Sequence, residues 1–156
     1  MKSNFIRGLS LTRPWPWTFL CKELPAKKRV ENRSWRPPQH LMGQYLALHA
    51  AKSWDEDDCE WIEDVTGLSV PREKESPHSI IFAVCKLSGF VEDESDERLP
   101  AEQRMWFFGP YGWLLTDFVA LREPVACKGA QGLWGFEKKP DVLTAVRQQY
   151  ALAATA

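Results

Sequence analysis

The sequence has 156 residues, of which 44% are hydrophobic and 12% aromatic, and its formal net charge at pH 7 is −1. A chain of this length can bury one substantial core but not two ordinary ones, so we expect a single domain over residues 1–156. Charged residues make up 26% of the chain, which excludes wholesale disorder. Apolar runs are far shorter than the roughly 20 residues of a membrane helix, and no signal-peptide core follows the first residues. We therefore expect a globular, cytoplasmic protein with no membrane segment.

The first third of the chain predicts two strands separated by a short helix. Residues 5–11 form the first expected strand, and Pro14 and Pro16 then open a helix, because proline is tolerated in a first helical turn. Pro25 ends this helix. Residues 28–35 alternate with the period of a strand, yet they carry polar groups on both faces.

The middle of the chain predicts an apolar strand over residues 44–51 and an acidic helix over residues 54–65. Ser53 and Glu56 have the spacing of a capping box at the start of this helix. Its apolar residues recur at helical spacing, so we expect one side to pack on the core while the acids face water.

The remaining elements are two long strands and a closing helix. Residues 79–91 are rich in β-branched and aromatic side chains, residues 113–121 form a further strand, and Pro140 opens an amphipathic helix. Strands and helices do not alternate regularly. The sequence therefore predicts an α+β domain built on a small mixed or antiparallel β-barrel with about three flanking helices.

The small net charge conceals an uneven distribution. Residues 55–64 contain seven acids and no base, and residues 92–97 contain five acids and no base. The rest of the chain has 20 basic and nine acidic residues, a surplus of 11 positive charges. A basic remainder suits a surface that binds a polyanion, whereas solvated acidic faces are the alternative interpretation.

Residues 13–36 combine positive charge with indole rings. This segment contains seven bases, two acids and three tryptophans. Cations interleaved with flat rings suit single-stranded nucleic acid, because phosphates take the charge while unstacked bases stack on the rings. Core packing is the alternative role for each tryptophan.

Two further polar segments are candidate ligand contacts. Glu31, Asn32, Arg33 and Trp35 cluster in a strand where a chain selected for stability alone would alternate apolar and polar residues. They either tie neighbouring elements together or contact a ligand. Residues 128–134, KGAQGLW, place glycines beside a lysine and an amide, a pattern that suits close approach to a phosphate or base but also an ordinary turn.

The sequence supports neither a metal site nor hydrolysis by a Ser-His-Asp catalytic triad. The four cysteines lack C-x-x-C spacing and are expected to be reduced packing residues, and the three histidines lack metal-ligand spacing. The pattern G-x-S-x-G is absent as well. We therefore expect no metal and no cofactor.

Three segments together resemble the ASCH domain, a branch of the PUA-like superfamily. They are LSLTRPW at residues 9–15, KRVENRSW at residues 28–35 and GQYLALHAAK at residues 43–52. The resemblance implies a small β-barrel with flanking helices and a cleft that binds RNA or a nucleotide-like ligand. It places Pro14, Trp15, Lys28, Glu31, Arg33 and Trp35 on that cleft, with Lys52 and residues 131–134 at its rim.

The leading hypothesis is an RNA- or nucleotide-binding protein with a basic, tryptophan-containing cleft. The proposed contact residues are Arg13, Pro14, Trp15, Lys28, Glu31, Asn32, Arg33, Trp35, Lys52, Lys128, Gln131 and Trp134.

Two alternatives stay open. Some ASCH-like proteins resemble amidohydrolases of acylated cytidine that use a Lys, Thr and Glu set, and others resemble ribonucleases. Lys28 matches the lysine, but Glu31 occupies the threonine position and residues 79–91 hold no carboxylate, so that triad does not transfer. A hydrolase would therefore use Lys28 and Glu31 as acid and base. The other alternative is a protein partner bound by the acidic helix 54–65.

Overall fold

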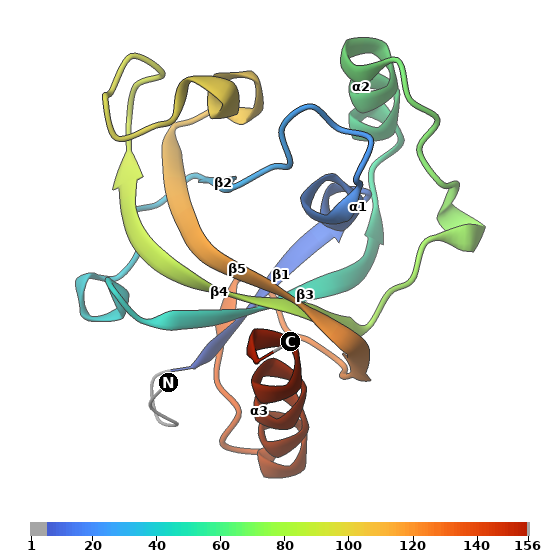
Figure 1. Cartoon of the computed structure of the whole chain (residues 1–156), viewed down its shortest axis with the longest axis vertical. Helices are drawn as coiled ribbons and strands as arrows, with labels where there is room; N and C mark the ends of the chain where they lie inside the picture. Colours follow the sequence, from blue (N-terminus) through green and yellow to red (C-terminus); the bar gives the residue numbers. More distant parts are fainter. Residues whose placement is uncertain (1–5, 156) are drawn as a thin grey trace.

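Six strands form one mixed sheet in the computed structural model, which describes residues 6–155 (Figure 1). In chain order they are β1 (Arg7–Arg13), β2 (Val30–Arg33), β3 (Tyr45–Trp54), β4 (Ile80–Val91), β5 (Tyr111–Ala126) and β6 (Leu133–Trp134). Across the sheet the order is β2-β5-β4-β3-β1-β6, with β1 parallel to β3 and the other neighbours antiparallel. The expected α+β class is therefore confirmed.

The sheet stays open, which corrects the expectation of a closed barrel. β2 and β6 are its edges, and within residues 6–155 they do not pair with each other. β6 pairs only with Gly8 and Leu9 of β1, so Ser10 and the residues after it have no strand partner on that side. There a side chain spans the gap, because Arg33 Nη2 of β2 donates to Ser10 O at 2.8 Å. Polar side chains thus occupy the place where a ladder would close the barrel.

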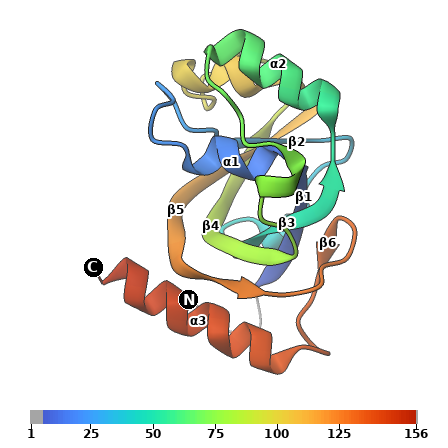
Figure 2. The ribbon, with the colours of Figure 1, turned by 90° about the vertical axis from the view of Figure 1, so that its right-hand side faces the viewer.

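Three α-helices flank the sheet, as expected. They are α1 (Trp15–Leu20), α2 (Glu56–Thr66) and α3 (Pro140–Ala154). Figure 2 shows α1 and α2 on one side of the sheet and α3 on the other, where α3 packs against β5 and β4. Within residues 6–155, no helix is long and apolar enough to cross a bilayer.

Apolar side chains on the two faces of the sheet form separate cores. In β3, Leu46 and Leu48 point into the core beneath α1, together with Phe19. Ala47, between them, belongs to the core beneath α3, together with Val146. Successive residues of a strand face opposite ways, so a strand covered on both faces is apolar throughout. β3 is therefore packed on both faces, and it positions the start of α2, which follows directly after it.

Some boundaries differ from those expected. β3 runs on to Trp54, so the capping box of Ser53 and Glu56 is wrong, and the N-cap of α2 is Asp55. Its carboxylate accepts a hydrogen bond from the Asp58 amide at 2.9 Å. Of the first expected strand, residue 5 lies outside the described residues. β5 extends past both ends of the predicted strand 113–121, because it pairs with β4 as far as Ala126.

Candidate functional site

A cavity of about 700 Å³ lies in the gap between β1 and β2, with the N-terminal half of α2 as its far wall. Its lining consists of three aromatic rings, four carboxylates, two cations and three small polar side chains: Ser10, Thr12, Trp15, Lys28, Glu31, Asn32, Arg33, Asp55, Asp57, Asp58, Trp61 and Phe108. Ligand pockets for small molecules have volumes in this range. The open edge of the sheet therefore provides a binding-sized cavity.

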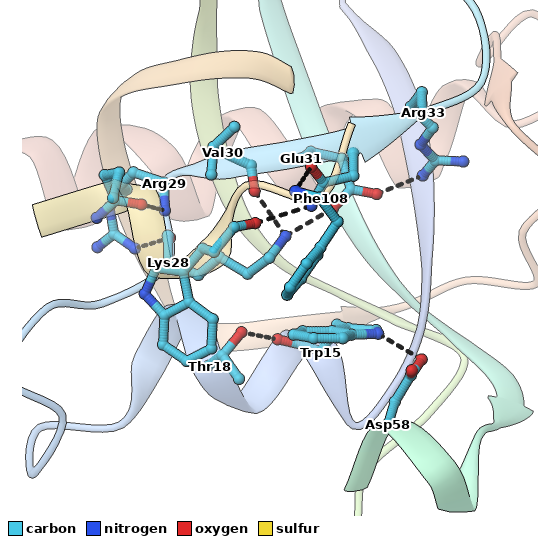
Figure 3. Close-up of polar contacts among 12 residues, drawn as sticks. Trp15, Thr18, Lys28, Arg29, Val30, Glu31, Arg33, Asp58 and Phe108 are labelled. Atoms are coloured by element: carbon cyan, nitrogen blue, oxygen red, sulfur yellow. Dashed lines mark hydrogen bonds and ion pairs between the residues drawn. The ribbon is translucent and has the colours of Figure 1, made fainter. Parts of the chain in front are cut away.

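Lys28 forms the floor of the cavity and is only 2% exposed. Its Nζ donates to Val30 O at 2.6 Å and to Glu31 Oε1 at 3.2 Å (Figure 3). It also lies 5.2 Å from the ring centroids of both Trp15 and Phe19. Burial lowers the pKa of Lys28 from its usual value, and the neighbouring Glu31 carboxylate opposes this effect. The cavity thus contains an amine that gives up its proton more easily than a surface lysine does.

Glu31 and Arg33 continue the polar floor. Glu31 Oε2 lies 3.0 Å from Arg33 Nη2, which also donates to Ser10 O. The carboxylate is therefore held between two cations, Lys28 and Arg33, as Figure 3 shows. Paired charges of this kind keep their geometry without a ligand. The first of the two expected roles is confirmed, since these side chains tie β2 to β1, and both also line the cavity.

The aromatic side of the cavity is made by Trp15, Trp61 and Phe108. Their ring centroids are 4.9–6.2 Å apart, and Phe108 is 50% exposed. Asn32 fixes the loop that carries Phe108, because its Oδ1 accepts hydrogen bonds from the amides of Phe108 and Gly109 at 2.8 and 3.1 Å. The half-exposed Phe108 ring therefore lines the cavity, and hydrogen bonds to Asn32 hold its backbone in place.

The acids of α2 give the cavity a charge that the sequence did not predict. Asp58 Oδ2 accepts from Trp15 Nε1 at 2.7 Å, and Asp55 and Asp57 lie beside it on the lining. Burial raises the pKa of Asp58, and Asp55 and Asp57 raise it further, while the Trp15 hydrogen bond and Lys28 act against them. Among the described lining residues, four carboxylates stand against two cations. The first cavity is therefore acidic, whereas the sequence suggested a basic cleft.

A second cavity of about 770 Å³ adjoins the first and shares Ser10, Thr12 and Arg33 with it. Three of the predicted contact residues, Lys52, Lys128 and Gln131, line this second cavity and not the first. The predicted contacts that line a cavity therefore fall into two groups. Trp15, Lys28, Glu31, Asn32 and Arg33 line the first cavity, where Arg33 borders both.

Four predicted contact residues line neither cavity. Arg13 is 2% exposed, and its guanidinium donates to four backbone carbonyls. Pro14 lines a small apolar hollow on another side of α1. Trp35 packs its ring edge-on to Trp113, at 4.8 Å between centroids. Trp134 lies over Gly8, where a Cβ would come within 2.4 Å of its ring, and donates to Ser10 Oγ.

Several lining residues were missed from the sequence. Asp58 and Trp61 are three positions apart, a spacing that puts both on one face of a helix, so the periodicity of α2 contained this signal. Phe108 gave no local signal, because only its long-range hydrogen bonds to Asn32 bring it to the cavity. Within residues 6–155, no group of three or more His, Cys, Asp or Glu side chains is arranged to hold a metal ion.

The comparisons with known proteins bear on the fold. The sequence matches no protein-family model and no curated protein. The structure is similar to the crystal structure of a mutant of ZmASCH, a protein from Zymomonas mobilis, with a TM-score of 0.51. The two chains are 15% identical, and the match covers 94% of this chain and 99% of that one. The chain thus has the fold of an ASCH protein, the family that the three sequence segments resemble, although its sheet is open where the resemblance implied a barrel.

Proposed function

We propose that the cavity between β1 and β2 binds the base of a nucleotide or of a single-stranded RNA. The observation that carries this proposal is the lining itself: aromatic rings on one side and a fixed Lys28–Glu31–Arg33 network on the other. An unstacked base needs both a ring to stack on and polar groups that read its edge. The ASCH-like fold supports the same class of ligand.

The charge of the cavity indicates which base edges fit best. Asp57 and Asp58 accept hydrogen bonds and, when ionised, donate none. Bases with exocyclic amino groups, cytosine, adenine and guanine, offer donors to these carboxylates, whereas uracil offers only its ring N–H. The acidic wall therefore favours amino-bearing bases.

The test removes the exposed ring and measures binding. Phe108→Ala deletes a stacking surface without opening a core, because half of the side chain is already exposed. Loss of one stacked base is worth about 1–3 kcal/mol, so the dissociation constant of a labelled RNA tetranucleotide should rise roughly 5- to 150-fold in fluorescence anisotropy titrations.

Leu152→Ala is the matched control, since Leu152 is 51% exposed on α3, on the opposite side of the sheet. It should bind as the unmodified protein does. Equal binding by the Phe108 variant, or equal weakening by both variants, would contradict the proposal.

A second candidate function, hydrolysis of RNA or of an acylated nucleoside, is favoured by one observation. Lys28 is a buried amine with a lowered pKa in a ligand-sized cavity, beside the Glu31 carboxylate. A neutral amine can take a proton from water while the hydroxyl attacks an amide carbon; the amide C–N bond then breaks and the proton passes to the leaving nitrogen. Lys28 would act as the base, with Glu31 holding it in place.

Product formation separates the two functions. If Lys28 is the base, chromatography should show acetate and cytidine released from N-acetylcytidine, or fragments from RNA, and Lys28→Met should abolish the product. The rate should rise with pH through the lowered pKa of Lys28, because only the neutral amine accepts a proton. Absence of product from both substrates would leave only binding, whereas undiminished turnover by the variant would show that Lys28 is not the base.

A further inference from the structure

Charge is divided between the two adjoining cavities. The first has an excess of carboxylates, whereas the second is lined by Arg33, Lys52 and Lys128 and, among the described residues, by no carboxylate. Lys52 and Lys128 are exposed, and within residues 6–155 neither amine forms an ion pair. The second cavity therefore attracts anions. Arg33 is paired with Glu31, but Lys52 and Lys128 are not neutralised by the described part of the chain.

The loop of residues 128–132 lines this cavity and has backbone amides that no group of the described chain accepts from. Within residues 6–155, the amides of Gly129, Ala130 and Gln131 donate to no acceptor, while the carbonyls of Lys128 and Ala130 are both hydrogen-bonded. Consecutive amides without partners are a common means of binding phosphate oxygens. The lining thus supplies two kinds of anion-binding group.

The loop is held in place before any ligand arrives. Ser10 Oγ donates to Ala130 O at 2.6 Å and accepts from Trp134 Nε1 at 3.0 Å. Gly129 packs closely against the ring of His49, where an added Cβ would clash with ring atoms. His49 in turn is fixed by its contact with Cys127 O at 2.7 Å. Preorganised donors bind a ligand without the entropic cost of ordering a loop.

We infer that the second cavity binds the phosphate of the ligand whose base occupies the first, so that the ligand is a nucleotide or an RNA strand and not a free nucleoside. This inference rests on the proposed function. Ser10, Thr12 and Arg33 border both cavities, and one molecule can therefore extend from one to the other. The acidic cavity repels phosphate and the basic cavity attracts it, which fixes the direction in which the ligand lies.

The experiment compares nucleosides with their phosphates by isothermal titration calorimetry. The probes are cytidine, adenosine and guanosine, their 5′- and 3′-monophosphates, and an RNA tetranucleotide. Charge-assisted hydrogen bonds to the phosphate should strengthen binding of at least one monophosphate about tenfold or more over its nucleoside. The double variant Lys52→Ala/Lys128→Ala should lose that gain and bind the nucleosides unchanged.

The matched control is Lys22→Ala/Lys138→Ala, which removes the same charge from exposed lysines that line neither cavity. This control variant should still bind the monophosphate more tightly than the nucleoside. The tetranucleotide separates the two sources of phosphate: tighter binding than any monophosphate indicates a strand, and equal binding indicates a free nucleotide.

The outcomes separate this inference from the function on which it rests. Nucleosides that bind with no gain from phosphate, or a gain that survives in the Lys52/Lys128 variant, would overturn the phosphate site and leave base binding intact. Monophosphates that depend on Lys52 and Lys128 but are indifferent to Phe108→Ala would support the phosphate site and overturn base binding in the first cavity. Binding of none of the probes would overturn both.

Discussion

Arg13 and Lys28 are both cations with only 2% of their surface exposed, yet their surroundings give them different roles. Arg13 donates to the backbone carbonyls of Ala51, Lys52, Glu73 and Ser76, so its donors tie the end of β3 to residues 73–76. Lys28 has one carboxylate, one carbonyl and two ring faces around it. Guanidinium stays protonated when buried, whereas an amine can lose its proton. Only Lys28 is therefore suited to proton transfer.

His49 predicts a dependence of stability on pH. Burial lowers its pKa below about 6.5, and nearby Lys139 lowers it further, while the Cys127 carbonyl acts against them. The unfolded chain therefore binds more protons than the folded one between the lowered pKa and 6.5. The free energy of unfolding should fall as the pH falls through this window, by about 1.4 kcal/mol for each tenfold difference between the two acid constants.

Urea unfolding at pH 7.5, 6.5 and 5.5 measures this effect. His49→Gln has no titrating ring, so its stability should change less over this interval than that of the unmodified protein. His78→Gln alters an exposed histidine and should follow the unmodified protein. If the stability of the His49 variant falls with pH as steeply as that of the His78 variant, the pH dependence does not come from His49.

At the scale of elements, the periodicity of apolar and polar residues predicted the type of each element, but not its surroundings. Alternation predicted a strand over residues 28–35, and the structure has the shorter strand β2, Val30–Arg33, inside that range. Its polar residues on both faces are explained by its position, because β2 is an edge strand that borders a cavity. For the acidic helix, the apolar face was predicted, but the side on which Asp58 lies was assigned to water. Its burial depends on α1, which supplies Trp15 from a distant part of the sequence.

β5 shows why element lengths resist prediction. Its second half contains Arg122, Glu123 and Pro124, residues that are uncommon in central strands, and Asp117 has a positive φ of 50°. Pairing with β4 nevertheless continues to Ala126, with register shifts along the way. Tertiary pairing therefore outweighs local propensity, and the sequence alone placed the end of this strand five residues too early.

At the scale of the whole molecule, topology determines which charges meet. The surplus of positive charge outside residues 55–64 and 92–97 suggested that one basic cleft collects it. Instead β3 delivers Lys52 to one cavity, and the start of α2, immediately after it, delivers Asp55, Asp57 and Asp58 to the other. A sequence shows how many charges a segment has, but the turn from β3 into α2 decides the side on which each one lies.

This separation predicts a weak dependence of RNA binding on salt. If Lys52 and Lys128 contact two phosphates, the logarithm of affinity should fall with the logarithm of salt concentration with a slope of about −1.4, so that affinity for an RNA tetranucleotide drops about sevenfold between 50 and 200 mM salt. Anisotropy titrations at these concentrations measure the slope, which should approach zero in the Lys52→Ala/Lys128→Ala variant. For an RNA dodecamer, a surface that neutralises six phosphates would instead give a slope of about −4.2 and a loss of roughly 340-fold over the same range. A loss of that size would show that the strand lies on a broad basic surface outside the two cavities.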